Sequence, residues 1–300
     1  MTERIVHVCN GDHTADKLSL ADLPGDIRVW ADALDRGPLL PVDDAAHYAA
    51  RGTYWGGDAA TKLARYDRDF DDATRAEELI LWFEHDLFDQ LALVRLLSRL
   101  ARRGHTTNTT IVSIDRHPDV PTFTGLGQLE PEQLAALWPN RVTLSRDALE
   151  EAQATWVAVT ANDPRALVFL MRRVKALPFL AGAIERHLEE LPDPTSGMSR
   201  TERQLLAAVA RGEANLGAAV RAIDPRYPIT DVVLAATLDT LRTCGFVEGT
   251  AITPLGRQAL AGAIDRVHEV GIDDWRGGVR LSGKGPVWRW ESRERKLFER

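Results

Sequence analysis

The stretch EELILWFEHDLFDQLALVRLLS, residues 77–98, decides the fold of this chain. It opens with a run of apolar residues, breaks into the polar triplet Glu84-His85-Asp86, and then places apolar residues three and four positions apart. A short apolar run with polar ends predicts a buried strand, and the later spacing predicts an amphipathic helix. The stretch therefore predicts a strand that turns directly into a helix, with a charged cluster at the corner.

Further apolar segments predict strands at residues 4–9, 27–31 and 109–114, with helical segments between them. Alternating strands and helices predict a parallel sheet with right-handed crossovers. Each strand ends in a polar cluster: NGD, DALDRGP, EHD or DRHPD. Because the carboxyl ends of parallel strands share one sheet edge, we expect these clusters to meet at a ligand site. Residues 1–128 are thus predicted to form an α/β domain, a Rossmann-like parallel sheet with helices on both faces.

The rest of the chain is predicted to be mainly helical. Residues 129–192 show helical spacing and are expected to pack on the α/β domain as an extension. The segment LPDPTSG, residues 191–197, is the best domain boundary because it is rich in proline, glycine and serine. Residues 198–300 then give three helices and a small strand pair, the order of a winged-helix-like domain.

Two observations bear on nucleic-acid binding by this last domain. Its third helix carries one basic residue, Arg242, against Asp231 and Asp239, whereas a DNA-reading helix is normally richer in Arg, Lys, Asn or Gln. The tail, residues 273–300, interleaves arginine with tryptophan, which can stack on bases. We favour the alternative in which the tail is a small sheet that packs its tryptophans onto the body.

Composition indicates a soluble protein of a reducing cytoplasm. Hydrophobic residues make up 44% of the 300 residues and charged residues 27%, as in globular proteins. No apolar run is long enough to span a bilayer, and no signal-peptide pattern opens the chain. Cys9 and Cys244 lie far apart, so we expect no disulfide framework.

The net charge of −7 is unevenly distributed. Residues 197–300 hold 16 Lys and Arg against 13 Asp and Glu, and the preceding residues hold 21 against 31. The acidic first part would repel a nucleic-acid backbone. The two parts are therefore expected to have different partners, and a membrane is not expected to be one of them.

The polar strand ends supply the candidate site. His85 titrates near neutral pH and could exchange protons beside a carboxylate, while Asp12 or Asp32 would orient a substrate or a metal. The candidate catalytic residues are Asp12, Asp32, His85 and Asp86. The candidate ligand-binding residues flank them: Asn10, Gly11, Thr14, Gly37, Glu84, Gln90, Gly125 and Gly127. The sequence identifies neither a metal nor a cofactor.

Each of these positions has a simpler alternative. The N-terminus of a helix after Asn10-Gly11 would stabilise a bound anion by about 0.3–1 kcal/mol per charge, but the negative charge of Asp12 would repel a bare phosphate. A metal, a sugar hydroxyl or an amine suits Asp12 better. Alternatively, Asp12 and Asp86 only cap helices, and Glu84 and His85 are solvated.

The segment Asp32–Pro38 superficially resembles the GDxxDRGP stretch of calcineurin-like metallophosphoesterases. Those enzymes bind two metals and also need an Asp-x-His element and a Gly-Asn-His element. The sequence has neither, and Ala31 replaces the glycine. We therefore infer no two-metal site.

Several segments together resemble a bacterial family known as domain of unknown function 1835. The likeness is carried by residues 7–12, 30–38, 81–90, 123–127 and 177–180, and extends more loosely to the tail around Trp275. The family has no established activity, so the resemblance implies no mechanism.

Three hypotheses for function remain. The first is an α/β domain that binds a small polar ligand, phosphorylated and nucleotide-like molecules included, and performs hydrolysis or group transfer. The second is a ligand-sensing regulator whose winged-helix-like domain contacts nucleic acid or a protein. The third is an interaction scaffold without a ligand, in which the polar clusters satisfy one another.

Overall fold

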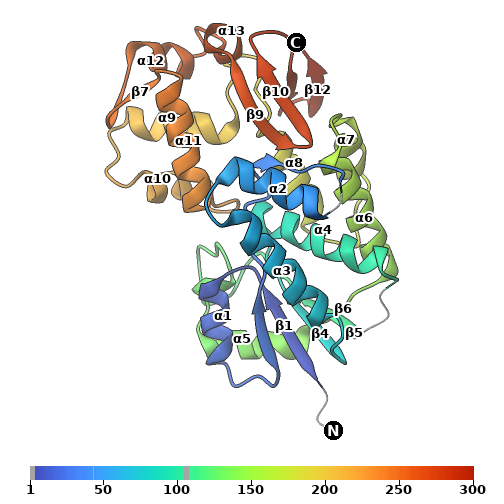
Figure 1. Cartoon of the computed structure of the whole chain (residues 1–300). Coiled ribbons are helices and arrows are strands. Elements are labelled where there is room, and N and C mark those ends of the chain that lie inside the picture. Colours follow the sequence, from blue (N-terminus) through green and yellow to red (C-terminus); the bar gives the residue numbers. More distant parts are fainter. Residues whose placement is uncertain (1–3, 43, 105–107) are drawn as a thin grey trace.

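A computed structural model describes residues 4–42, 44–104 and 108–300 as a mixed α/β structure that is 47% helical (Figure 1). The central sheet has the order β2-β1-β4-β5-β6. Its first four strands are parallel, which confirms the predicted parallel sheet, and β6 is antiparallel at the edge. The bounds are β1 (Ile5–Cys9), β2 (Asp26–Val29), β4 (Glu78–Trp82), β5 (Asn108–Val112) and β6 (Val142–Thr143).

Helices cover both faces of this sheet. Successive side chains of a strand point to opposite faces, so each central strand contributes to two cores. Val6, Val8, Leu79 and Leu81 enter one core, and Cys9, Ile80 and Trp82 enter the other. The first core includes side chains of α3 (Ala59–Ala73), α4 (Leu87–Arg102) and α6 (Arg146–Thr160). The second includes side chains of α1 (Asp12–Ser19), the 3-10 helix η1 (Leu126–Gln128) and α5 (Pro131–Leu137), with η2 (Trp138–Asn140) packed beside them. Strands buried on both faces explain the nearly continuous apolar runs in the sequence.

A helix that the sequence did not predict, α2 (Asp44–Trp55), lies between β3 (Gly37–Pro38) and α3. His47 and Arg51 are one turn apart on its buried side. Arg51 binds the carboxylate of Asp32 through two nitrogens, at 3.0 and 2.7 Å. The fully buried residues of the helix are polar, and its apolar contacts come from the partly buried Tyr48 and Trp55, which is why hydrophobic periodicity did not reveal it.

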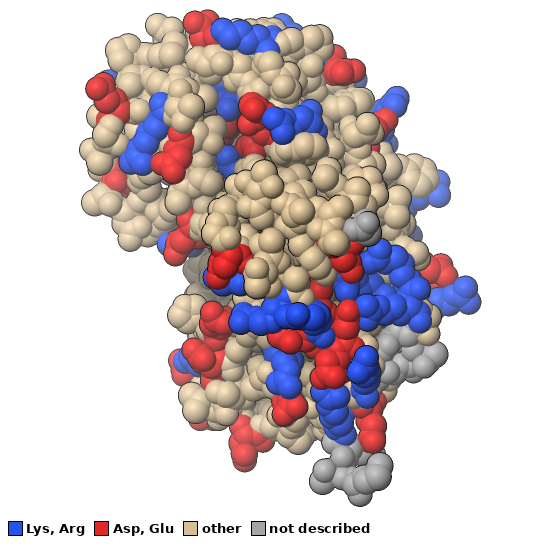
Figure 2. Space-filling model, in the orientation of Figure 1, with Lys and Arg blue, Asp and Glu red and all other residues tan. Residues whose placement is uncertain are grey.

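A buried ionic cluster joins α3 to α4. Asp67 is 1% exposed and pairs with Arg95 and Arg99. Its oxygens also accept hydrogen bonds from Trp30 Nε1 at 2.9 Å and from the Tyr48 hydroxyl at 2.8 Å. On the face shown in Figure 2, basic and acidic side chains intermingle around these helices.

The helices α7 (Arg165–Met171) and α8 (Leu180–Leu188) complete the body of the molecule. Ser199 and Glu202 form a capping box at the start of the next helix. That helix belongs to a third core, around Leu205, Leu241 and Phe246. Its elements are α9 (Arg200–Ala210), α10 (Leu216–Ile223), α11 (Asp231–Thr243), β7 (Val247–Glu248), β8 (Ala251–Ile252) and α12 (Pro254–Leu260).

The tail returns to the body, as favoured above. Trp290 is 1% exposed and belongs to the same core as the sheet and α4. Strand β9 pairs in parallel with β3, with Gly37 opposite Arg276. The tail elements are α13 (Arg266–Val270), β9 (Ile272–Gly277), β10 (Val279–Gly283), β11 (Trp288–Glu291) and β12 (Lys296–Glu299).

Candidate functional site

A crevice opens where the carboxyl ends of β1 and β4 meet. Helix α1, which follows β1, lies on one face of the sheet, and α3, which leads into β4, lies on the other. The helices connected to these two neighbouring strands therefore lie on opposite faces of the sheet. Such topological switch points are where open α/β sheets bind ligands. The crevice has a volume of about 500 Å³, within the range of small-molecule sites.

Eight of the predicted site residues line this crevice: Asn10, Gly11, Asp12, Thr14, Glu84, Asp86, Gly125 and Gly127. They come from the end of β1, the end of β4 and the start of η1. The expectation that polar strand ends converge thus holds for β1 and β4. The residues that the sequence did not single out are His13, Phe88, Asp89, Thr124, Gln128, Pro228, Ile229 and Thr230.

The first wall of the crevice is the start of α1. The backbone of its N-cap residue, Gly11, is extended, and no side chain caps the helix. Neither Asp12 nor Thr14 therefore acts as a cap, contrary to the simpler interpretation of Asp12. Asp12 and His13 are exposed at the mouth, and the positive end of the helix faces the crevice.

The second wall is a cluster of three buried carboxyl groups. Asp89 accepts the Glu84 N–H at 3.0 Å and the amide of Asn10, so it ties β4 to β1. Asp86 accepts the Asp89 N–H at 2.8 Å and caps α4, as the simpler interpretation of Asp86 proposed. Glu84 accepts the Leu126 N–H at 3.1 Å through Oε1. Its buried Oε2 accepts no donor among the described residues, and the Glu84 carboxyl group lies beside that of Asp89, with which it can share a proton.

Burial raises the pKa of each of these carboxyl groups above its ordinary value. Nearby acidic groups raise it further: Asp86 acts on Glu84, Asp35 acts on Asp86, and Glu84 acts on Asp89. Carboxylates this close cannot all ionise in a site of low dielectric constant. The cluster therefore holds protons near neutral pH and can both donate and accept hydrogen bonds.

His85 lies apart from the crevice, although it is next to Glu84 and Asp86 in the sequence. Its ring is 1% exposed and lies 6.0, 6.1 and 6.4 Å from the rings of Phe123, Phe179 and Tyr227. Burial lowers its pKa, so the imidazole is neutral at pH 7. The structure does not bring His85 together with Asp12, and neither His85 nor Glu84 is solvated.

Three other predicted residues support the site from outside it. Asp32 is held by Arg51 in a neighbouring hollow beyond β2. Gly37 pairs with β9, where an added Cβ would lie 2.7 Å from the Tyr54 ring. Gln90 donates from Nε2 to the Glu84 carbonyl at 2.6 Å and lines a separate cavity on the far side.

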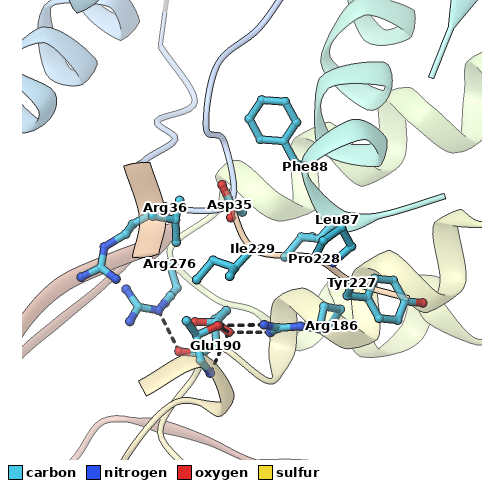
Figure 3. Close-up of a pocket in the computed structure, with 12 residues that line it drawn as sticks. Asp35, Arg36, Leu87, Phe88, Arg186, Glu190, Tyr227, Pro228, Ile229 and Arg276 are labelled. Atoms are coloured by element: carbon cyan, nitrogen blue, oxygen red, sulfur yellow. Dashed lines mark hydrogen bonds and ion pairs between the residues drawn. The ribbon is translucent and has the colours of Figure 1, made fainter. Parts of the chain in front are cut away.

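The segment between α10 and α11 closes the crevice from the C-terminal part of the chain. Arg226 pairs with Asp115 at 3.6 Å, Tyr227 packs near His85, and Pro228 to Thr230 line the crevice. Next to this segment, Arg186 and Glu190 form a buried ion pair (Figure 3). Arg276 donates to the Glu190 carbonyl at 2.7 Å. A cavity of about 20 Å³ there has room for a single water molecule.

In residues 4–42, 44–104 and 108–300, no group of three or more His, Cys, Asp or Glu side chains is arranged to hold a metal ion. None of the described helices is long and apolar enough to cross a membrane. No protein-family model matches the chain, and no match was found among curated proteins. The likeness to the bacterial family above stays a prediction.

Proposed function

We propose that this protein binds a small molecule rich in hydroxyl groups at the crevice of a Rossmann-like domain. The observation that carries the proposal is the chemistry of the crevice lining. It offers carboxyl, amide and hydroxyl groups, and none of the described residues that line it is a lysine or an arginine. A phosphate with several charges would find neither lysine nor arginine among the described lining residues. A sugar hydroxyl both donates and accepts, so it matches carboxyl groups that share protons.

We further propose that Glu84, rather than His85, exchanges protons with a bound substrate if the ligand is transformed. A raised pKa near the working pH is what a general acid or base needs. Glu84 lines the crevice beside Asp86 and Asp89, whereas the His85 ring packs among aromatic side chains. Hydrolysis or group transfer at a sugar-like centre is the reaction class that this arrangement supports.

The proposal is tested by ligand-induced thermal stabilisation with ribose, glucose and inorganic phosphate. Wild type is expected to gain stability with a sugar and none with phosphate. Asp12→Ala, at the mouth of the crevice, should lose at least tenfold in affinity. Asp26→Ala, an exposed aspartate at the start of β2, is the matched control and should bind like wild type. Equal binding by both variants would remove Asp12 from the site.

For the C-terminal part we propose a winged-helix-like module that closes the crevice instead of reading nucleic acid. On α11, Arg242 pairs with Asp239 at 3.1 Å, and Arg221 of α10 pairs with Asp231 at 3.1 Å. These pairs neutralise the charge that duplex DNA would need. The expected result is no binding of the protein to duplex DNA, even at low salt.

A further inference from the structure

The crevice continues into a second hollow along the edge of the sheet. This hollow, of about 610 Å³, lies outside the end of β2, where Ala31 and Asp32 line it. Phe88 and Thr230 line both spaces, so the two are adjacent. Because β2, β1 and β4 are consecutive in the sheet, the pair of hollows spans two strand spacings, about 10 Å.

The walls of the second hollow differ in chemistry from those of the crevice. Three aromatic side chains line it, Trp55, Tyr66 and Phe88, together with Leu63 and Val232. The buried indole N–H of Trp55 has no hydrogen-bond partner in the described part of the chain, so a strong donor is left unused. This second hollow is referred to below as the aromatic hollow.

The charges that line the aromatic hollow are paired. Asp32 is bound by Arg51 at 2.7 Å, and Lys62 pairs with Asp58 at 3.3 Å. Asp231, which is 88% exposed on its side chain, pairs with Arg221. A charged group would therefore gain little there, whereas a flat uncharged ring would bury apolar area against aromatic faces.

We infer that the aromatic hollow takes a planar heterocyclic ring joined to the hydroxylated group in the crevice, so that the ligand is nucleoside-like. This inference rests on the proposed sugar site and adds the ring. Stacking of a base on an aromatic side chain contributes about 1–3 kcal/mol. Phe88 and Thr230, which line both hollows, mark the junction between the two parts of such a ligand.

The test compares ribose with adenosine, guanosine, cytidine and uridine by calorimetric titration of the full-length protein. At least one nucleoside is expected to bind wild type tenfold or more tightly than ribose. Val232→Trp fills the aromatic hollow from α11, where Val232 is 48% exposed, and should abolish this difference while leaving ribose affinity unchanged. Val157→Trp, on α6 at 65% exposure, is the matched control and should preserve it.

The outcomes separate this inference from the proposed function. If ribose and all four nucleosides bind wild type equally, the ring site is refuted and the sugar site stands. If none of the five binds and glucose does not bind either, both are refuted. If Val232→Trp lowers the melting temperature relative to Val157→Trp, Lys62→Trp replaces it in the test. Lys62 lines the same hollow from an exposed position on α3. Full nucleoside preference in a folded filled variant would also overturn the inference.

Discussion

Glu84→Gln should make the protein more stable at alkaline pH and leave it nearly unchanged at pH 4.5. The folded-state pKa of Glu84 lies above its ordinary value, so the folded state binds this proton more tightly than the unfolded chain. The resulting stability is fully present below the ordinary pKa of 4.5 and is lost as the pH rises through the folded value of about 8. An amide cannot ionise, so the variant does not incur this loss.

The size of the effect follows from the pKa of Glu84. One pKa unit corresponds to about 1.4 kcal/mol, so the full rise sets a ceiling on the order of 4–5 kcal/mol. Asp86 and Asp89 share the proton exchange, so removal of one of the three groups should recover only part of it, roughly 1–3 kcal/mol at pH 9. The amide oxygen can still accept the Leu126 N–H, which preserves the contact between β4 and η1.

Urea unfolding at pH 4.5, 7 and 9 measures this effect as the difference in free energy of unfolding between variant and wild type. Glu77→Gln, an exposed neighbour on the same segment, is the control and should show no pH-dependent difference. A Glu84→Gln variant that is destabilised equally at all three pH values would refute a protonated Glu84. A wild-type stability that does not fall between pH 4.5 and 9 would refute the whole protonated cluster.

Two further predictions concern the framework. Asp67→Ala should lower the free energy of unfolding by about 3–5 kcal/mol, because buried Arg95 loses its nearest carboxylate and is left with Asp44 at 3.7 Å. In the same urea titration, exposed Asp58→Ala should change it by less than about 0.5 kcal/mol. Gly125→Ala would place a Cβ 2.4 Å from Glu84 Oε1 and should cost about 1–3 kcal/mol. Gly11→Ala, with nothing within 4 Å of the added atom, should be nearly neutral, and equal effects at the two glycines would contradict this geometry.

Local sequence pattern was enough to find most of the secondary structure. The strand and helix predicted within residues 77–98 are β4 and α4, and α6 lies within the helical spacing predicted for residues 129–192. These elements are encoded by periodicities of two and 3.6 residues, which depend only on near neighbours. The parallel order of the main strands followed from their alternation with helices, and the polar strand ends followed from that order.

The sequence therefore determined most of the elements, α2 excepted, and the edge of the sheet at which a site should lie. Only the tertiary structure decided which side chains share that site, because adjacent residues at a strand-to-helix corner point in different directions. Glu84 enters the crevice, while His85 turns into the aromatic side chains behind it. Arg51 of α2 binds the carboxylate of Asp32, and Thr230, from the C-terminal part of the chain, lines the crevice. Such contacts arise from long-range packing, which no local periodicity records.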